Sequence, residues 1–410
     1  MCTGMKNPGL REIEGGVTAP DGFLATGIHC GIKKSKPDLA LIFSPSPATA
    51  AAVFTLSKVL AAPVLVDKAQ LERSRSMRAI VVNSGNANAC TGDRGMEDAW
   101  SMVAATARAL TIGEHEVLVS STGVIGQFLP TRIIVDGIVR AASELSPSGS
   151  TLAAEAIRTT DTFTKEIAVE TTVEGSRVRL GGMAKGSGMI APNMATMLAF
   201  VTTDACIAPD LLHQALRQAT DRSFNRISVD GDTSTNDMVV VLANGNAGHP
   251  ELTSCDSPGY DAFAEALEHV LVRLSKMIVV DGEGATKFVE INVHGAASEE
   301  AAVAAARAIA NSNLVKTAIH GEDANWGRIL AALGYSGIDF DPADVEISFG
   351  DLPILRRNYT IDFSEEKAKE VLARREIVIT VGLHRGHGSA SFWTCDLSKR
   401  YIEINANYRT

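Results

Sequence analysis

Short apolar runs alternate along this chain with amphipathic helical stretches, and this alternation restricts it to a mixed α/β fold. Four runs are β-branched and almost continuously apolar, as is typical of central strands buried on both faces: Leu39–Phe43, Ala79–Val82, Val117–Ser120 and Met197–Thr202. Apolar residues recur with helical spacing in four longer stretches: Glu97–Leu110, Thr131–Leu145, Leu211–Ala219 and Tyr260–Lys276. We expect sheets whose outer faces are covered by these helices.

Two glycines, Gly282 and Gly284, followed by a new apolar run, predict that a second, smaller domain begins near residue 282. The chain has 410 residues, and at roughly 150 residues per domain this length favours two or three domains. We therefore expect a core in 1–281 and a C-terminal α/β domain in 282–410. The expected elements of this domain are the strand Lys287–Val293, the helices Ser298–Asn311 and Trp326–Leu333, and the strands Val345–Phe349, Glu376–Val381 and Tyr401–Asn405.

Charge and cysteine use exclude several classes of function. Lys and Arg number 38 against 48 Asp and Glu, and no basic block occurs, so nucleic acid is a poor partner. Neither a bilayer-spanning run nor a signal-peptide core is visible, and we expect a cytoplasmic protein without membrane contact. The six cysteines are scattered without a Cys-x-x-Cys pair, which favours reduced thiols and no metal site.

Five polar loops rich in small residues follow apolar runs, and they are the candidate sites for chemistry. They are Asn83–Cys90, Ser120–Gly123, Gly181–Met194, Asp230–Asp237 and Asp281–Gly284. For any one of them alone, a tight turn is the favoured interpretation over a ligand loop, since Gly, Asn, Asp and Ser dominate turns. A nucleotide phosphate loop is excluded between Gly181 and Gly186, because its lysine, Lys185, precedes the second glycine instead of following it.

The stretch from Gly182 to Leu198 has the features of a self-cleaving site. A Gly-rich approach ends in Ala195 and Thr196, and Thr196 opens a buried run. A threonine hydroxyl needs a base to become a nucleophile, and a free α-amino group on the same residue can serve once the Ala195–Thr196 bond is broken. From the pattern alone, the favoured interpretation of Thr196 is the β-branched first residue of a strand.

The segment Met183–Leu198 resembles the processing site of the ornithine acetyltransferases, the glutamate N-acetyltransferases of arginine biosynthesis. Similarity extends from about Gly15 to the last residue and includes these segments: Asn83–Gly92, Ser120–Gly126, Thr159–Thr162, Ser228–Asp237, Asn325–Ile329 and Ile404–Thr410. The resemblance implies a self-processing, sandwich-like core. It also implies cleavage into fragments 1–195 and 196–410, assembled as an α2β2 heterotetramer.

The same resemblance implies the reaction and the residues that perform it. Thr196 would take the acetyl group from N2-acetylornithine, release ornithine and pass the acetyl group to glutamate in a ping-pong cycle. Thr122 and Gly123 would stabilise the oxyanion. The implied substrate-binding residues are Thr162, Lys185, Thr196, Glu283, Asn405 and Thr410. Thr160 is an alternative to Thr162, and Asp230, Asp232 and Asp237 are expected to support the site.

No cofactor is implied, and acetyl-CoA remains a candidate second acetyl donor. Two other classes of function stay open at this point. The first is a self-processing N-terminal-threonine amidase or aminopeptidase, in which water completes the cycle. The second is an unprocessed relative that only binds acetylated amino acids.

Overall fold

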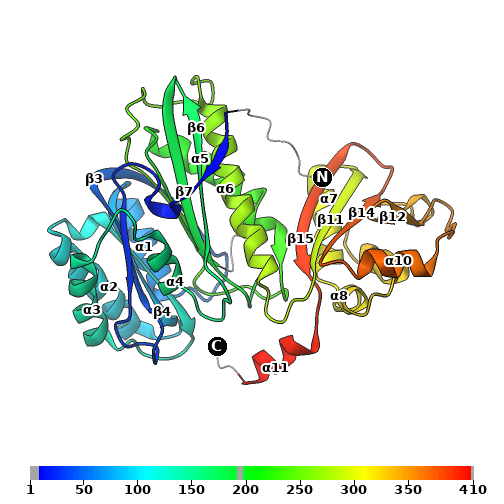
Figure 1. Cartoon of the computed structure of the whole chain (residues 1–410), viewed down its shortest axis with the longest axis horizontal. Coiled ribbons are helices and arrows are strands. Elements are labelled where there is room, and N and C mark those ends of the chain that lie inside the picture. The colour runs from blue at the N-terminus through cyan, green and yellow to red at the C-terminus, as the bar shows by residue number, and fades with distance from the viewer. Residues whose placement is uncertain (1–8, 192–196, 408–410) are drawn as a thin grey trace.

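The computed structural model describes residues 9–191 and 197–407, which form two β-sheets and the helices that cover them (Figure 1). In these residues the first sheet has nine strands. Eight of them run in the order β1 (Arg11–Ile13), β6 (Lys165–Val173), β7 (Ser176–Lys185), β8 (Leu198–Thr203), β10 (Met238–Ala243), β3 (Leu39–Phe54), β4 (Ser76–Asn86) and β5 (Val117–Val124). The ninth, β2 (Leu24–Ile28), pairs with β3. The second sheet has the order β13 (Leu352–Leu355), β12 (Glu346–Phe349), β14 (Glu376–Gly382), β11 (Phe288–Ala296), β15 (Gly388–Cys395) and β9 (Ile227–Ser228).

Helices cover both sheets, which confirms the predicted α/β class. In chain order they are α1 (Ala62–Arg73), α2 (Gly92–Leu110), α3 (Thr131–Ser143), α4 (Ser150–Ala156), α5 (Pro209–Asp221), α6 (Tyr260–Val280), α7 (Glu299–Ala310), α8 (Asn313–His320), α9 (Trp326–Gly334), α10 (Glu365–Leu372) and α11 (Lys399–Asn407). Figure 1 shows α6 running along β6 and β7, with α1 to α3 at one end of the molecule and the second sheet at the other. Across the described residues, none of the helices has the length and apolarity that a membrane span requires.

The centre of the first sheet is apolar on both faces, and β10 shows why its sequence is a continuous apolar run. Val239 and Val241 pack into the core that includes α5 and α6. The alternate residues Met238, Val240 and Leu242 pack into the core on the opposite face. Because side chains alternate across a strand, a strand covered on both faces has no position for a polar residue.

The expectation that the run Val117–Ser120 forms a central strand is wrong. The run belongs to β5, which is the last strand of its sheet and pairs only with β4 among the described strands. It is nevertheless buried, because α1 and α2 pack against it. The side chain of Asp67 in α1 accepts a 2.8 Å hydrogen bond from the Val119 amide. The apolar sequence of this run therefore reflects burial under helices and not a central position in the sheet.

The predicted strand Tyr401–Asn405 is also wrong, because these residues lie in the helix α11. Their alternating pattern fits a strand, but no described strand pairs with them. The helix instead places Tyr401 and Asn405 four residues apart on one face. From that face the Asn405 side chain donates a hydrogen bond to Glu283, and the Tyr401 hydroxyl donates one to Asp230.

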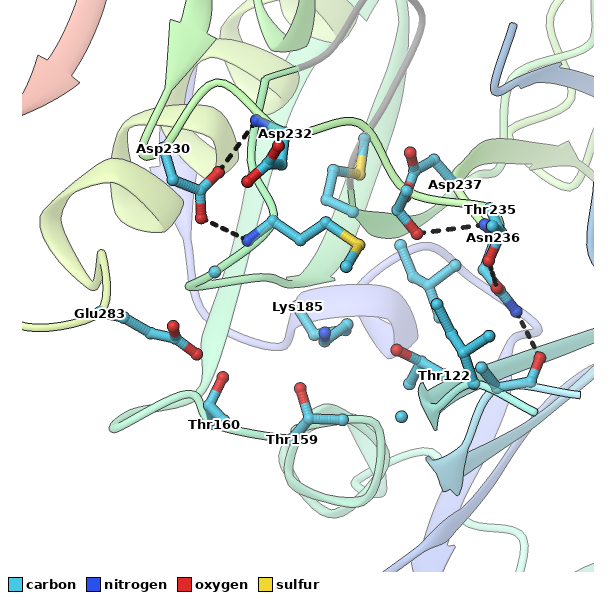
Figure 2. Close-up of a pocket in the computed structure, with 18 of the residues that line it drawn as sticks. Thr122, Thr159, Thr160, Lys185, Asp230, Asp232, Thr235, Asn236, Asp237 and Glu283 are labelled. Carbon is cyan, nitrogen blue, oxygen red and sulfur yellow. Dashed lines mark hydrogen bonds between the residues drawn. The ribbon is translucent and has the colours of Figure 1, made fainter. Parts of the chain in front are cut away.

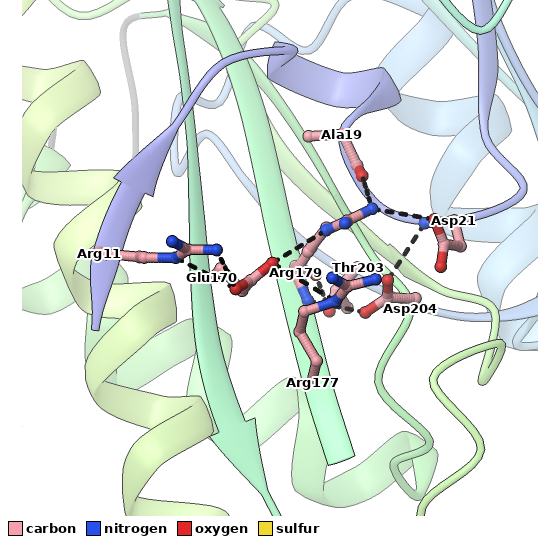
Figure 3. Close-up of polar contacts among 8 residues, drawn as sticks. All are labelled: Arg11, Ala19, Asp21, Glu170, Arg177, Arg179, Thr203 and Asp204. Carbon is pink, nitrogen blue, oxygen red and sulfur yellow. Dashed lines mark hydrogen bonds and ion pairs between the residues drawn. The ribbon is translucent and has the colours of Figure 1, made fainter. Parts of the chain in front are cut away.

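An ion-pair network fastens the N-terminal segment to the first sheet (Figure 3). The Arg11 guanidinium donates to the Glu170 carboxylate at 2.7 Å, and Arg179 donates to the other oxygen of Glu170 at 3.2 Å. Arg179 also pairs with Asp21 at 3.0 Å. Asp204 accepts hydrogen bonds from the backbone amides of Asp21 and Arg179. Strand β1 is thus held to β6 by side chains as well as by its backbone.

The second sheet is assembled mainly from the chain after residue 287, with one exception. Strand β9, which precedes α6, pairs in parallel with β15 and so joins the second sheet. Trp393 and Cys395 of β15 pack into the same core as α6. The domain boundary between residues 281 and 282 stays a prediction.

Candidate active site

A pocket of about 190 Å³ lies where loops of the first sheet meet Glu283 and α11. It brings together residues that the sequence singled out from distant segments: Thr122, Gly123, Lys185, Glu283 and Asn405. Figure 2 shows Lys185 between Glu283 and Thr160 on one side and Thr122 on the other. Ala195, Thr196 and Thr410 lie outside the described residues. Met197, which follows Thr196 in the chain, lines the pocket.

Thr122 and Gly123 end strand β5 at the pocket, where β4 approaches very closely. Gly123 pairs with Gly85 in the parallel ladder and has a φ of 131°. A Cβ atom at Gly123 would lie 2.3 Å from the Gly85 carbonyl carbon. Both the backbone conformation and the close approach require glycine here. Gly123 also lines the pocket, so its backbone is available there.

Asn236 fixes the loop 230–237 to the same end of β5. Its side-chain amide donates to the Ala87 carbonyl at 2.6 Å and to the Ser121 carbonyl at 2.8 Å. The Thr235 hydroxyl donates to the Asn236 side-chain oxygen at 2.5 Å. Asn236 is buried, so these bonds satisfy an amide that could not face water. One asparagine thus holds three pocket segments in register.

Lys185 ends strand β7 with its side chain directed into the pocket. The residue is only 9% exposed, and within the described part of the chain its ammonium group donates no hydrogen bond. Burial lowers the pKa of Lys185 from the ordinary lysine value, while the carboxylates of Asp161, Asp237 and Glu283 oppose that shift. A buried cation with unused donors is a suitable partner for an anionic group of a ligand.

The threonines of the 159–162 turn have different environments. Thr159 and Thr160 line the pocket, and the Thr160 hydroxyl lies 2.7 Å from the Ser187 hydroxyl. Thr162 is not among the lining residues, because its amide and its hydroxyl both donate to the Asp281 carboxylate. The geometry therefore puts Thr162 behind the pocket wall and puts Thr160, the alternative, in it.

Glu283 is held at the pocket by three contacts. Its amide donates to the Ser187 carbonyl at 2.8 Å, and its carboxylate accepts from the Asn405 side chain at 2.8 Å. A Cβ at Gly188 would lie 2.4 Å from the Glu283 carboxyl carbon, so Gly188 leaves the space that this side chain occupies. Its other carboxylate oxygen accepts no hydrogen bond from the residues that the structure describes.

Two pocket residues, Asp230 and Tyr401, were not expected to contact a ligand. Asp230 accepts hydrogen bonds from the amides of Met189 and Ile190, at 2.6 and 2.8 Å, and from the Tyr401 hydroxyl at 3.2 Å. Burial and the nearby Asp230 raise the pKa of the Tyr401 phenol. The sequence indicated that the loop of Asp230 is a candidate ligand loop. It did not indicate Tyr401, because the residues of α11 were wrongly predicted to form a strand.

Comparison with known proteins identifies the family. The ArgJ family model matches residues 24–410. The chain belongs to the ArgJ family. Every pocket residue named above lies inside the matched range, whereas β1 precedes it.

Curated ArgJ-family relatives cover almost the whole chain. The arginine biosynthesis bifunctional protein ArgJ of Symbiobacterium thermophilum is 53% identical over 98% of this chain and 100% of its own length. The protein of the same name from Chlorobaculum tepidum is 53% identical over 95% of this chain and 96% of its own. A crystal structure of the Bacillus halodurans protein matches with a TM-score of 0.51 and 47% identity, over 52% of this chain and 100% of that one.

Proposed function

We propose that this chain is a glutamate N-acetyltransferase of arginine biosynthesis, which moves an acetyl group from N2-acetylornithine to glutamate and releases ornithine. Membership of the ArgJ family supports this assignment, as do relatives named arginine biosynthesis bifunctional proteins. The observation that carries the proposal is one pocket in which a buried ammonium, a carboxylate and a Thr-Gly backbone surround the residue after Thr196.

The proposed substrates fit the charges of this pocket. Both are amino acids, so each presents a carboxylate and either an amine or an acetylated amine. Lys185, whose donors are unused, would bind the carboxylate, and Glu283 would bind an ammonium group. Thr160 would contribute a hydroxyl, and Asn405 would orient Glu283. Thr162 would act through Asp281 instead of touching the substrate.

The proposed cycle has two acyl transfers on Thr196. Its Oγ attacks the acetyl carbonyl of N2-acetylornithine while its α-amine takes the hydroxyl proton. The Thr122 hydroxyl and the Gly123 amide donate to the tetrahedral oxyanion, and ornithine leaves with the proton. The glutamate amine then attacks the acetyl-threonine ester and regenerates the free hydroxyl. No metal or cofactor enters either step.

The α-amine of Thr196 requires cleavage of the Ala195–Thr196 bond, and the proposal includes this self-cleavage. A fragment 196–410 would contain 410 − 195 = 215 residues, or 52% of the chain. The solved Bacillus halodurans chain is matched over its full length by 52% of this chain. A solved relative whose chain has the length expected for the fragment 196–410 supports the proposed cleavage of this chain. We further propose an α2β2 assembly in the cytoplasm, with acetyl-CoA as a second acetyl donor.

The decisive experiment follows the acetyl group. Purified enzyme receives N2-acetylornithine labelled in the acetyl group, with and without glutamate, and the label is followed into N-acetylglutamate and free acetate. We expect acetylglutamate to dominate; dominant acetate would instead identify an amidase. On a denaturing gel, wild type should give two fragments, and Thr196→Ala should give one uncleaved and inactive chain. A single intact chain from active wild-type enzyme would refute the proposed mechanism.

A further inference from the structure

Self-cleavage needs a proton carrier that the transfer reaction does not need. In the mature enzyme the α-amine of Thr196 serves as the base, but before cleavage this nitrogen is an amide and cannot accept the hydroxyl proton. A second group must therefore take the proton from the threonine hydroxyl and protonate the departing nitrogen. The inference below rests on the proposed function and concerns this earlier step.

Asp237 lies beside Met197, the described residue that follows the proposed cleavage site in the sequence. Strands β8 and β10 run parallel, with Met238 opposite Leu198, so Asp237 and Met197 are neighbours at the same end of the two strands. The Met238 amide donates to the Met197 carbonyl at 3.1 Å. Met197 is joined by one peptide bond to residue 196. Position 237 is therefore the neighbour, across the ladder, of the residue that directly follows Thr196 in the sequence.

The carboxyl group of Asp237 is buried and incompletely satisfied. The residue is 2% exposed and lines the pocket, and within residues 9–191 and 197–407 its Oδ2 atom has no hydrogen-bond partner. Its polar neighbours are the side chain of Ser234 and the backbone of Met197, and Lys185 acts on it as a nearby cation. Burial raises the pKa of Asp237 well above the usual aspartate range, despite these neighbours. A neutral carboxyl group can donate a proton, and its free oxygen can accept one.

Two other pocket carboxylates, Asp230 and Glu283, already accept hydrogen bonds from neighbouring residues. Asp230 accepts hydrogen bonds from three backbone amides, those of Met189, Ile190 and Asp232, and from the Tyr401 hydroxyl. Glu283 accepts the Asn405 amide. Figure 2 shows Asp230 and Glu283 on the far side of Lys185 from Asp237, which lies on the side of Thr122. Among these three acids, Asp237 alone combines the open oxygen with the position beside Met197.

We propose that Asp237 is the acid–base group of self-cleavage. The Thr196 Oγ attacks the Ala195 carbonyl carbon, an O–C bond forms, and the C–N bond breaks. The Asp237 carboxyl gives its proton to the departing nitrogen, and the resulting carboxylate recovers the proton from the threonine hydroxyl. Water then hydrolyses the ester, which yields the Ala195 carboxylate and the free Thr196 hydroxyl. The new α-amine takes over the base role in acetyl transfer.

The test separates cleavage from transfer with Asp237→Asn in two formats. In the first, the variant is made as one chain, and fragment formation is followed over time on a denaturing gel. Loss of an acid–base group should slow cleavage by about 10²-fold or more. In the second, fragments 1–195 and 196–410 are coexpressed, with Thr196 exposed as the first residue and verified by mass spectrometry. The precut variant should gain at least tenfold in acetyl transfer over the one-chain variant.

Asp67→Asn is a matched control for exchanging a buried acid for an amide. Asp67 is also fully buried, has an Oδ2 without a partner and has a raised pKa caused by burial, but it does not line the pocket. The control should cleave at the wild-type rate. Normal cleavage of the Asp237→Asn chain would overturn the inference and leave the transferase proposal intact. An inactive precut Asp237→Asn pair beside an active precut wild-type pair would also overturn the assignment to cleavage. An inactive precut wild-type pair would count against the transferase proposal itself.

Discussion

Replacing Lys165 with Met should destabilise the fold more than any surface change, because this lysine joins two buried carboxylates behind the pocket. Its Nζ atom lies 2.7 Å from Asp161 and 2.5 Å from Asp281, and the three side chains are 0%, 0% and 2% exposed. Removing one partner of a buried ion pair costs about 3–5 kcal/mol, since the remaining charge stays without compensation. Asp161 would retain the Gly186 amide, and Asp281 would retain Thr162. We therefore expect a loss within that range.

Thermal unfolding measures this loss best in a Thr196→Ala background, where both fragments remain in one chain. A loss of 3–5 kcal/mol should lower the midpoint by roughly 3–6 °C. Adding Asp281→Asn to Lys165→Met removes one uncompensated charge and should recover at least about 1 kcal/mol. A decrease below about 1 kcal/mol for Lys165→Met would refute the reasoning that this buried network stabilises the site.

The same network predicts the direction in which the stability of the fold changes at acid pH. Burial alone would raise the pKa of Asp161, but the charges of Lys165 and Lys185 hold it below the usual aspartate value. The ionised carboxylate therefore stabilises the fold above the unfolded-state pKa of about 3.9, and this contribution is lost as the pH falls from there toward the folded-state value. In Lys165→Met the pH dependence of the midpoint below pH 4 should be shallower than in wild type.

Three further predictions concern single side chains. Thr122→Ala should lower kcat by about 10²- to 10³-fold with little change in KM, and an unchanged kcat would exclude it as an oxyanion donor. Asn405→Ala removes the hydrogen bond to Glu283 and should raise KM about tenfold, which steady-state kinetics can measure; an unchanged KM would exclude that role. Burial lowers the pKa of Lys33 to about 8, so its labelling rate by an amine reagent should reach its midpoint near pH 8, whereas a midpoint above 10 would contradict this environment.

The elements of the fold were predictable where packing alone decides them. The run Met197–Thr202 became β8, and the helical spacing over Tyr260–Lys276 became α6. Strand β8 is covered on both faces and helix α6 along one stripe, so the pattern of apolar residues in each follows directly from which positions are buried. The order of the strands was not predictable, because β5 at the edge and β10 in the middle have the same apolar texture. Apolar content reports burial, and burial has more than one cause.

The pocket was predictable in its loops and less so in its individual contacts. Resemblance selected Lys185, Glu283 and Asn405, and the fold brings them into one cavity. It did not separate Thr160 from Thr162, because the difference arises from Asp281, a residue far along the chain that takes both donors of Thr162. Tyr401 was missed because a five-residue alternating pattern fits helix and strand equally.

The strand order explains how the proposed cut can leave the fold intact. Strands β8 and β10 belong to the fragment 196–410, yet they lie between β7 and β3 of the fragment 1–195. Lys185 at the end of β7 pairs with Leu198 at the start of β8, so the cut segment joins two strands that already share a ladder. Both fragments also contribute to the buried pair of Lys165 and Asp281. The proposed cleavage would leave the described ladders of this sheet in place, because the two fragments are interleaved and not merely adjacent.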